Sequence, residues 1–261
     1  MKVTCVQMNM LLSQPEENFA HAERLVRQAA ENKPDVIVLP ETWNTGFFPK
    51  NDLRSLCDNE GERTKAVFGA LARELGVNIV AGSVSDLRGE KIYNTAYIFN
   101  RNGGLVASYD KTHLFSPMGE HESYEKGGRL CRFELDGVKC GIIICYDIRF
   151  PELIRSLALE GMDVLFAVSQ WPAARSTHLQ TLAAARAIEN QVFLACCNSC
   201  GVAESTVYGG GSVMLDPLGQ VLAHAGDKEE IISAEFDIGT IQQIRGSIPV
   251  FEDRRPELYH L

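Results

Sequence analysis

Short apolar runs alternate with amphipathic stretches along most of the chain. The apolar runs predict strands, which lie at about 3–8, 36–39, 77–84, 92–99, 105–109, 141–144, 163–168 and 192–196. The amphipathic stretches predict helices, which lie at about 15–30, 67–75, 151–160 and 177–190. Val36–Leu39 and Gly141–Ile144 are apolar almost without interruption, which is typical of strands buried on both faces of a sheet. The alternation predicts an α/β fold.

Turn and cap residues mark several boundaries of these elements. Ser13-Gln-Pro-Glu16 predicts a capping box, with Pro15 in the first turn of a helix. Asn102-Gly103 predicts a hairpin between two strands. After residue 200 helical periodicity fades, and further strands are predicted at about 213–215, 221–222 and 231–236. The polar tail from Thr240 contains two prolines and predicts an extended arm.

No linker or low-complexity segment divides the chain, so we expect one domain over residues 1–261. Its core is predicted at about 1–238 and its C-terminal arm at about 239–261. One internal similarity is present: Pro34–Trp43 and Met162–Trp171 both contain an Asp, an apolar strand and a polar loop that ends in Trp. This similarity predicts two related halves with loops at equivalent strand ends.

Composition excludes several classes of protein. The chain has 261 residues, of which 45% are hydrophobic and 23% charged, as in ordinary globular domains. A net charge of −9 argues against a nucleic-acid partner, and no apolar run is long enough to cross a membrane. The chain passes from Lys2 directly into a predicted strand, without the pattern of a secretory signal, so we expect a cytoplasmic protein.

The eight cysteines are expected to be reduced thiols. Several of them lie inside apolar strand-like runs, where Cys behaves as a small buried apolar residue. Cys197 and Cys200 form a CxxC pair, but no second pair stands at zinc-finger spacing. We therefore expect no metal site.

Three chemically active residues each follow an apolar strand: Glu41, Lys111 and Cys145. Sites in α/β sheets form at the carboxyl ends of strands. A thiolate can act as nucleophile, a carboxylate can move its proton, and an ammonium can lower the thiol pKa and neutralise an oxyanion. Spacing alone leaves an alternative open, in which Glu41 and Lys111 are solvated charges and Cys145 is a packing residue of the core.

The local sequences around these residues resemble the three signature segments of the nitrilase superfamily of carbon–nitrogen hydrolases. These segments are Leu39-Pro-Glu41, Asp110-Lys111-Thr-His-Leu-Phe115 and Gly141-Ile-Ile-Ile-Cys145-Tyr-Asp147-Ile-Arg149-Phe-Pro151-Glu152. The resemblance runs from Val3 to the Asp216-Pro-Leu-Gly219 turn. It implies a four-layer αββα sandwich, a Glu–Lys–Cys triad, two-fold pairing of subunits into a homodimer, and no metal or organic cofactor.

The resemblance also suggests roles for neighbouring residues. Glu120 best matches an assisting carboxylate of the family, although Glu122 and Glu125 lie close to it in sequence. The backbone N–H of Tyr146 is a candidate second donor to the oxyanion. Asp147 and Arg149 are interpreted as a buried pair that shapes the turn after the nucleophile.

Two stretches, Ser169–Ser176 and Ala184–Gln191, resemble the branch of ω-amidases, which act on the ω-amide of small 2-oxo acids such as 2-oxoglutaramate. Such substrates carry a carboxylate at the far end, for which Arg175 is the candidate partner. Candidate walls of the pocket are Trp43, Phe47, Phe115 and Trp171. The alternatives are a nitrilase, an N-carbamoyl amino acid or amine hydrolase, and a binding or scaffold protein that has lost activity.

Overall fold

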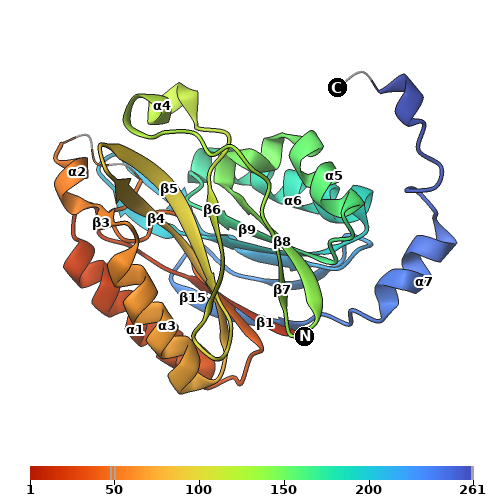
Figure 1. Cartoon of the computed structure of the whole chain (residues 1–261), viewed down its shortest axis with the longest axis horizontal. Helices are drawn as coiled ribbons and strands as arrows, with labels where there is room; N and C mark the ends of the chain where they lie inside the picture. Colours follow the sequence, from red (N-terminus) through yellow and green to blue (C-terminus); the bar gives the residue numbers. More distant parts are fainter. Residues whose placement is uncertain (48, 50, 260–261) are drawn as a thin grey trace.

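The computed structural model describes residues 1–47, 49 and 51–259, and two β-sheets lie at its centre (Figure 1). The first sheet has the strand order β15-β1-β2-β4-β5-β6, with β3 beside β4, and the second has the order β14-β13-β10-β9-β8-β7. The bounds of the first sheet are β1 (Lys2–Gln7), β2 (Val36–Val38), β3 (Asp58–Asn59), β4 (Asn78–Arg88), β5 (Lys91–Phe99), β6 (Leu105–Asp110) and β15 (Glu230–Glu235). Those of the second are β7 (Arg132–Leu135), β8 (Val138–Ile144), β9 (Val164–Ser169), β10 (Phe193–Asn198), β13 (Val213–Leu215) and β14 (Val221–His224). A separate hairpin joins β11 (Cys200–Ala203) to β12 (Thr206–Gly209).

Helices cover the outer face of each sheet. Helices α1 (Pro15–Ala30) and α3 (Glu62–Leu75) bury Phe19, Val26 and Phe68 against the first sheet. Helices α5 (Pro151–Leu159) and α6 (Ser176–Asn190) pack on the second sheet. The same hydrophobic core includes Val38 and Ile98, which lie on the inner face of the first sheet. The order of layers is helix, sheet, sheet, helix, so the predicted αββα sandwich is confirmed.

The internal similarity has a structural counterpart. Strand β2 pairs in parallel with β1 and β4, and β9 pairs in parallel with β8 and β10, so each is a central strand of its sheet. The loops after β2 and β9 meet between the sheets, where the backbone N–H of Glu41 donates to the carbonyl of Ser169 over 3.4 Å. This contact places Glu41, from the first of the two similar segments, beside Ser169, from the second.

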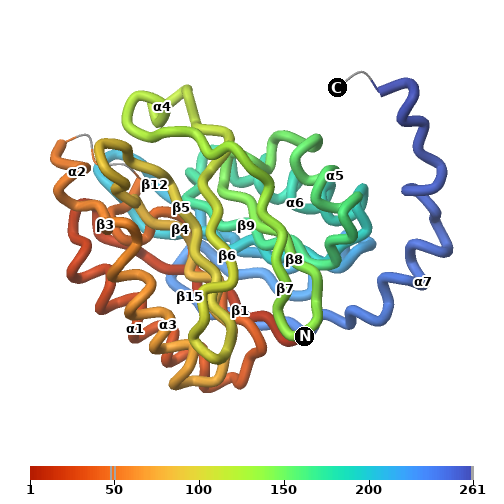
Figure 2. The backbone as a smooth tube through the Cα atoms, in the orientation of Figure 1, coloured from red at the N-terminus to blue at the C-terminus, as the bar shows by residue number. Residues whose placement is uncertain are grey.

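Two local predictions are wrong. The Ser13 side chain does not cap α1: Gln14 occupies the N-cap position, and Ser13 has a φ of 61°. The tail does not start as an extended arm, because Thr240–Ser247 forms helix α7, which buries Ile241 and holds Arg245 Nη1 3.2 Å from Asp163 Oδ1. After α7 the backbone runs along the side of the molecule that carries α5 (Figure 2).

The remaining helices are short. They are α2 (Leu53–Leu56), in the connection from β2 to β3, and α4 (Glu120–Ser123), in the connection from β6 to β7. In the described part of the chain, no helix has the length and apolar character that a membrane span requires.

Candidate active site

The structure brings Glu41, Lys111 and Cys145 together between the carboxyl ends of their strands. Glu41 follows β2, Lys111 directly follows β6, and Cys145 directly follows β8. Glu41 and Lys111 are fully buried, and Cys145 is 8% exposed. Lys111 Nζ lies 2.7 Å from Glu41 Oε1, and the Cys145 thiol contacts the Glu41 carboxylate. The strand-end pattern thus located three side chains that contact one another.

A second carboxylate completes this cluster. Glu120, the first residue of α4, is fully buried, and both of its carboxylate oxygens lie 2.9 Å from Lys111 Nζ. The backbone N–H of Phe115 donates to Glu120 Oε2 over 2.5 Å. Glu122 and Glu125 are exposed. Of the three candidate acids, the one that contacts Lys111 is therefore Glu120.

Asn94 also belongs to the cluster, although it was not among the residues predicted from the sequence. Its Nδ2 donates to Glu41 Oε1 over 2.9 Å and to Glu120 Oε1 over 3.2 Å. Asn94 lies inside β5, where a short amide is unfavourable, and this misfit with strand propensity was the available signal. The backbone N–H of Gln170 donates to Glu41 Oε2 over 2.8 Å, so both oxygens of Glu41 are held in place.

Burial and charge shift the pKa values of the cluster. Burial alone would lower the pKa of Lys111, but the charges of Glu120 and Glu41 raise it well above its usual value. Burial raises the pKa of Glu120, against the opposing effect of Lys111. Burial and the charge of Glu41 raise the pKa of the Cys145 thiol well above its usual value. The free site therefore contains a protonated amine between two carboxyl groups and a neutral thiol beside one of them.

The backbone at Cys145 is strained in a way that presents its side chain. Cys145 has a φ of 46°, in the left-handed region that non-glycine residues rarely adopt. It begins a 3-10 turn, Cys145–Arg149, at the end of β8. This sharp turn from strand to helix places the thiol in the wall of a pocket.

Asp147 holds this turn against the segment that carries Lys111. Its fully buried carboxylate accepts hydrogen bonds from the Ile144 N–H (2.9 Å), the Tyr109 hydroxyl (2.8 Å) and the His113 N–H (2.9 Å). None of its bonds in the described structure involves Arg149, so the predicted Asp147–Arg149 pair is wrong. Arg149 lines the pocket beside Cys145, so the two side chains leave the turn in different directions.

We expect Asp147→Ala to lower the free energy of unfolding by about 3 kcal/mol or more, because several buried donors lose their acceptor. Urea denaturation checks this value. Asp253→Ala is the control, since Asp253 is exposed on the tail, and it should change stability by less than about 0.5 kcal/mol. A loss below about 1 kcal/mol for Asp147→Ala would contradict the assigned bonding.

Cys145 opens into a pocket with aromatic and cationic walls. The pocket is lined by Phe47, Phe115, Met118, Cys145, Tyr146, Arg149, Gln170, Trp171, Pro172 and Arg175. The Arg175 guanidinium lies 5.1 Å from the Phe115 ring centroid, and Trp171 Nε1 donates to the Arg175 carbonyl over 2.8 Å. The Tyr146 ring meets Phe115 edge-on at 5.0 Å. The structure thus places Phe115, Tyr146, Trp171 and Arg175 beside Cys145, as the sequence suggested.

Trp43 is not part of this pocket. It is fully buried in the core between the first sheet and helices α1 and α3. There its ring centroid lies 4.7 Å from that of Phe19 and 5.3 Å from that of Phe68. Its Nε1 donates to the Ala81 carbonyl over 2.7 Å. Trp43 therefore packs α1 and α3 on the first sheet, and the prediction that it walls the pocket is wrong.

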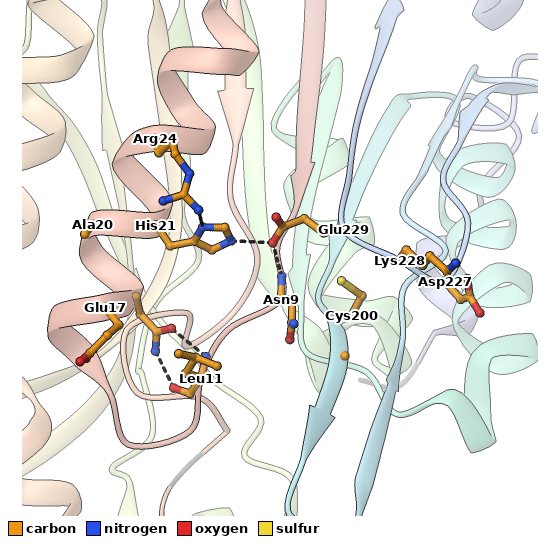
Figure 3. Close-up of a pocket in the computed structure, with 12 residues that line it drawn as sticks. Asn9, Leu11, Glu17, Ala20, His21, Arg24, Cys200, Asp227, Lys228 and Glu229 are labelled. Carbon is orange, nitrogen blue, oxygen red and sulfur yellow. Dashed lines mark hydrogen bonds and ion pairs between the residues drawn. The ribbon is translucent and has the colours of Figure 1, made fainter.

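A larger groove elsewhere contains none of these residues (Figure 3). It lies between α1 and the loop before β15, where His21 Nε2 lies 2.6 Å from Glu229 Oε2. The same Glu229 oxygen accepts the Asn9 N–H over 3.0 Å, and Arg24 contacts the other nitrogen of the His21 ring. These polar groups are thus hydrogen-bond partners of one another. Across the described residues, no group of three or more His, Cys, Asp or Glu side chains has the arrangement of a metal site.

A model of the carbon–nitrogen hydrolase family matches residues 2–246 of this chain. The chain belongs to the carbon–nitrogen hydrolase family. A 2-oxoglutaramate amidase of Bacillus subtilis is 42% identical over 257 residues, with 98% of each chain covered. The omega-amidase NIT2 of Danio rerio is 34% identical, with 93% of this chain and 91% of that protein covered.

Solved structures agree with this assignment. Nit3 of Saccharomyces cerevisiae, a member of branch 10 of the nitrilase superfamily, superposes with a TM-score of 0.90 at 29% identity and covers 98% of this chain and 96% of its own. The fold of this carbon–nitrogen hydrolase is that of the nitrilase superfamily, and the enzyme class is that of hydrolases acting on C–N bonds.

Proposed function

We propose that this carbon–nitrogen hydrolase is an ω-amidase, which converts the terminal amide of a small 2-oxo acid such as 2-oxoglutaramate into carboxylic acid and ammonia. The observation that carries the proposal is the contact of the Cys145 thiol with Glu41 at the base of a pocket that also contains Arg175. The 2-oxoglutaramate amidase that is 42% identical over nearly the whole chain supports it.

In the first half of the proposed reaction, Cys145 attacks the amide carbon while its thiol proton passes to Glu41. The Lys111 ammonium and the Tyr146 N–H stabilise the oxyanion that forms. The tetrahedral intermediate then collapses, and Glu41 gives the proton to the departing nitrogen, which leaves as ammonia. A thioester on Cys145 remains.

In the second half, Glu41 takes a proton from water, whose oxygen adds to the thioester carbon. Collapse of the second intermediate releases the acid, and the Cys145 sulfur recovers its proton from Glu41. Glu120 and Asn94 do not touch the reacting atoms in this scheme. They position Lys111 and Glu41 through the bonds of 2.9–3.2 Å described above.

The wall of the pocket that Arg175 forms suits a carboxylate. Arg175 presents a planar guanidinium that can bind a carboxylate through two parallel hydrogen bonds. Phe115 and Trp171 flank it and exclude water from the chain of the substrate. No metal or organic cofactor takes part in the proposed reaction.

We also propose that two copies pair through the outer layer formed by α5 and α6. Leu159 and Ile188 are 46% and 50% exposed on this layer, where a partner helix layer would cover them. Light scattering on the purified protein tests for a homodimer. Cysteines packed as small apolar groups, such as Cys140 and Cys196, support a reducing cytoplasmic environment.

The function is tested by measuring ammonia release by the wild-type protein from 2-oxoglutaramate, an N-carbamoyl amino acid and an aliphatic nitrile. We expect the highest kcat/KM for 2-oxoglutaramate, because the nitrile has no carboxylate for Arg175 and the N-carbamoyl compound presents to Cys145 a ureido carbon, which is less electrophilic than that of an amide. A higher kcat/KM for the nitrile or the N-carbamoyl compound would contradict the proposal.

A further inference from the structure

A second groove adjoins the substrate pocket on the side of the β11–β12 hairpin. The hairpin contributes Ala203, Thr206 and Tyr208 to its walls, and we call it the hairpin groove. Phe47 and Met118 line both this groove and the substrate pocket, so they form the partition between the two spaces. The groove has a volume of about 280 Å³. It therefore has room for several water molecules, each of which occupies about 30 Å³.

Tyr208 differs from the other buried tyrosines in the bonding of its hydroxyl group. The residue is only 4% exposed, and its hydroxyl binds none of the residues that the structure describes. In contrast, the hydroxyls of Tyr97, Tyr109 and Tyr124 each bind a side chain over 2.7 or 2.8 Å. A buried hydroxyl without a partner is unfavourable. Because Tyr208 lines the hairpin groove, a water molecule in the groove can supply the missing partner.

Tyr208 also lies close to the reacting groups. A β-bridge joins its backbone to Pro172, which lines the substrate pocket. Burial raises the pKa of Tyr208, and the charges of Glu41 and Cys145 raise it further, so the side chain lies within their electrostatic reach. Tyr208 therefore stands between the hairpin groove and the catalytic cluster.

Hydrolysis of a thioester requires a water molecule that arrives while the acyl group still occupies the substrate pocket. The acyl chain and the aromatic side chains Phe115 and Trp171 exclude water from that pocket. The hairpin groove lies on the other side of Phe47 and Met118, where the acyl group does not block it. A separate route of this kind admits water without release of the acyl group.

We propose that the hydrolytic water reaches the thioester on Cys145 through the hairpin groove, and that the Tyr208 hydroxyl binds this water beside Glu41. The proposal rests on the thioester chemistry of the proposed function. Glu41 takes one hydrogen of the water as a proton, and the Tyr208 oxygen accepts a hydrogen bond from the other. The water oxygen then bonds to the acyl carbon, the carbon–sulfur bond breaks, and the sulfur recovers the proton from Glu41. Other small nucleophiles take the same route.

Nucleophiles of different size test the route. Hydroxylamine and the larger O-methylhydroxylamine both compete with water for the thioester formed from glutaramate, and chromatography separates their products. We expect Ala203→Trp, which narrows the hairpin groove, to lower the yield of the O-methylhydroxylamine product relative to the hydroxylamine product roughly 10-fold, because overpacking penalises the larger nucleophile more.

Val202→Trp is the matched control for this variant. Val202 neighbours Ala203 on β11, but it is 63% exposed and does not line the groove, so its replacement should leave the product ratio unchanged. Thr206→Trp narrows the groove from the opposite strand and should act like Ala203→Trp. An unchanged ratio in both groove variants would overturn the proposed route.

Tyr208→Phe tests the binding of the water. The variant keeps the aromatic ring and should fold, because no described group loses a hydrogen-bond partner. At a fixed hydroxylamine concentration, we expect the ratio of hydroxamate to acid formed from glutaramate to rise roughly 3- to 10-fold, as for loss of one hydrogen bond to the attacking water. Hydroxylamine is the stronger nucleophile and depends less on such a partner. This ratio does not depend on which earlier step limits turnover.

An unchanged ratio in Tyr208→Phe would overturn the role of Tyr208, because a tyrosine that only supports the fold affects both nucleophiles alike. Failure of the proposed function gives a different result. In that case the wild-type protein itself would form no hydroxamate from glutaramate.

Discussion

Cys145→Ala is expected to lower ammonia release from 2-oxoglutaramate by about 10⁴-fold or more, because removal of a covalent nucleophile abolishes the whole acyl-transfer route. The variant should fold normally. Alanine is smaller than cysteine, and its introduction removes a buried thiol that lies against the charge of Glu41. Ammonia release and thermal unfolding, measured on the same preparation, check both parts of the expectation.

The matched control for this variant is Cys140→Ala. Cys140 lies on the same strand, β8, and is fully buried, but it does not line the pocket. Its replacement should reduce stability by about 1 kcal/mol and leave kcat/KM within about 3-fold of the wild-type value. If Cys145→Ala keeps more than a small fraction of the activity, or if Cys140→Ala loses as much, the assignment of the nucleophile is wrong.

Lys111→Met is expected to abolish activity and also to destabilise the protein. Removal of an oxyanion donor lowers the rate by about 10³-fold. Removal of the ammonium also leaves Glu41 and Glu120 buried side by side without a counter-charge, which costs about 3–5 kcal/mol of unfolding free energy. Urea denaturation measures this loss, and ammonia release measures the activity.

The pH dependence of this destabilisation has a definite sign. Burial raises the pKa of Glu120 in the wild-type protein, and Lys111 opposes that rise. Without Lys111 the pKa of folded Glu120 rises further above the value of about 4.3 for an unfolded glutamate. Such a group stabilises the fold below the unfolded pKa and loses this contribution as pH rises through the folded pKa. The gap between wild type and Lys111→Met should therefore widen from about pH 5 to pH 8.

A second substitution separates charge from packing in this prediction. Lys111→Met combined with Glu120→Gln removes one of the two unpaired carboxylates, so it should recover part of the lost stability at pH 8 while remaining inactive. If the double variant is no more stable than the single variant, and if the gap to wild type does not change with pH, the loss comes from packing and not from buried charge.

The strand-end pattern predicted that Glu41, Lys111 and Cys145 lie together, because their meeting depends on topology. Glu41, Lys111 and Cys145 follow strands whose carboxyl ends meet between the two sheets. The same pattern does not give the direction of each side chain within a loop. Trp43 stands two residues after Glu41 and points into the core under α1 and α3. Arg149 stands two residues after Asp147 and lines the pocket.

Other features depend on contacts between distant segments, which one sequence does not reveal. Asn94 reaches Glu41 and Glu120 only because β5 lies beside β4 and β6. Gln170 reaches Glu41 through the loop after β9, across 129 residues of chain. Helix α7 lies in a polar tail that also contains two prolines, and it forms where Ile241 is buried and Arg245 reaches Asp163. In each case tertiary contacts outweigh local propensity.

Hydroxylamine trapping tests the central claim, a thioester on Cys145, most directly. Hydroxylamine resembles the departing ammonia in size, so it can enter where ammonia leaves and attack the thioester carbon, expelling the Cys145 thiolate. With glutaramate as substrate, which carries the same amide and carboxylate but lacks the keto group that hydroxylamine would convert to an oxime, the thioester route predicts a hydroxamate product whose share rises with hydroxylamine concentration, at the expense of the acid. Formation of the acid alone at every hydroxylamine concentration would contradict a covalent intermediate and favour direct attack of water on the amide.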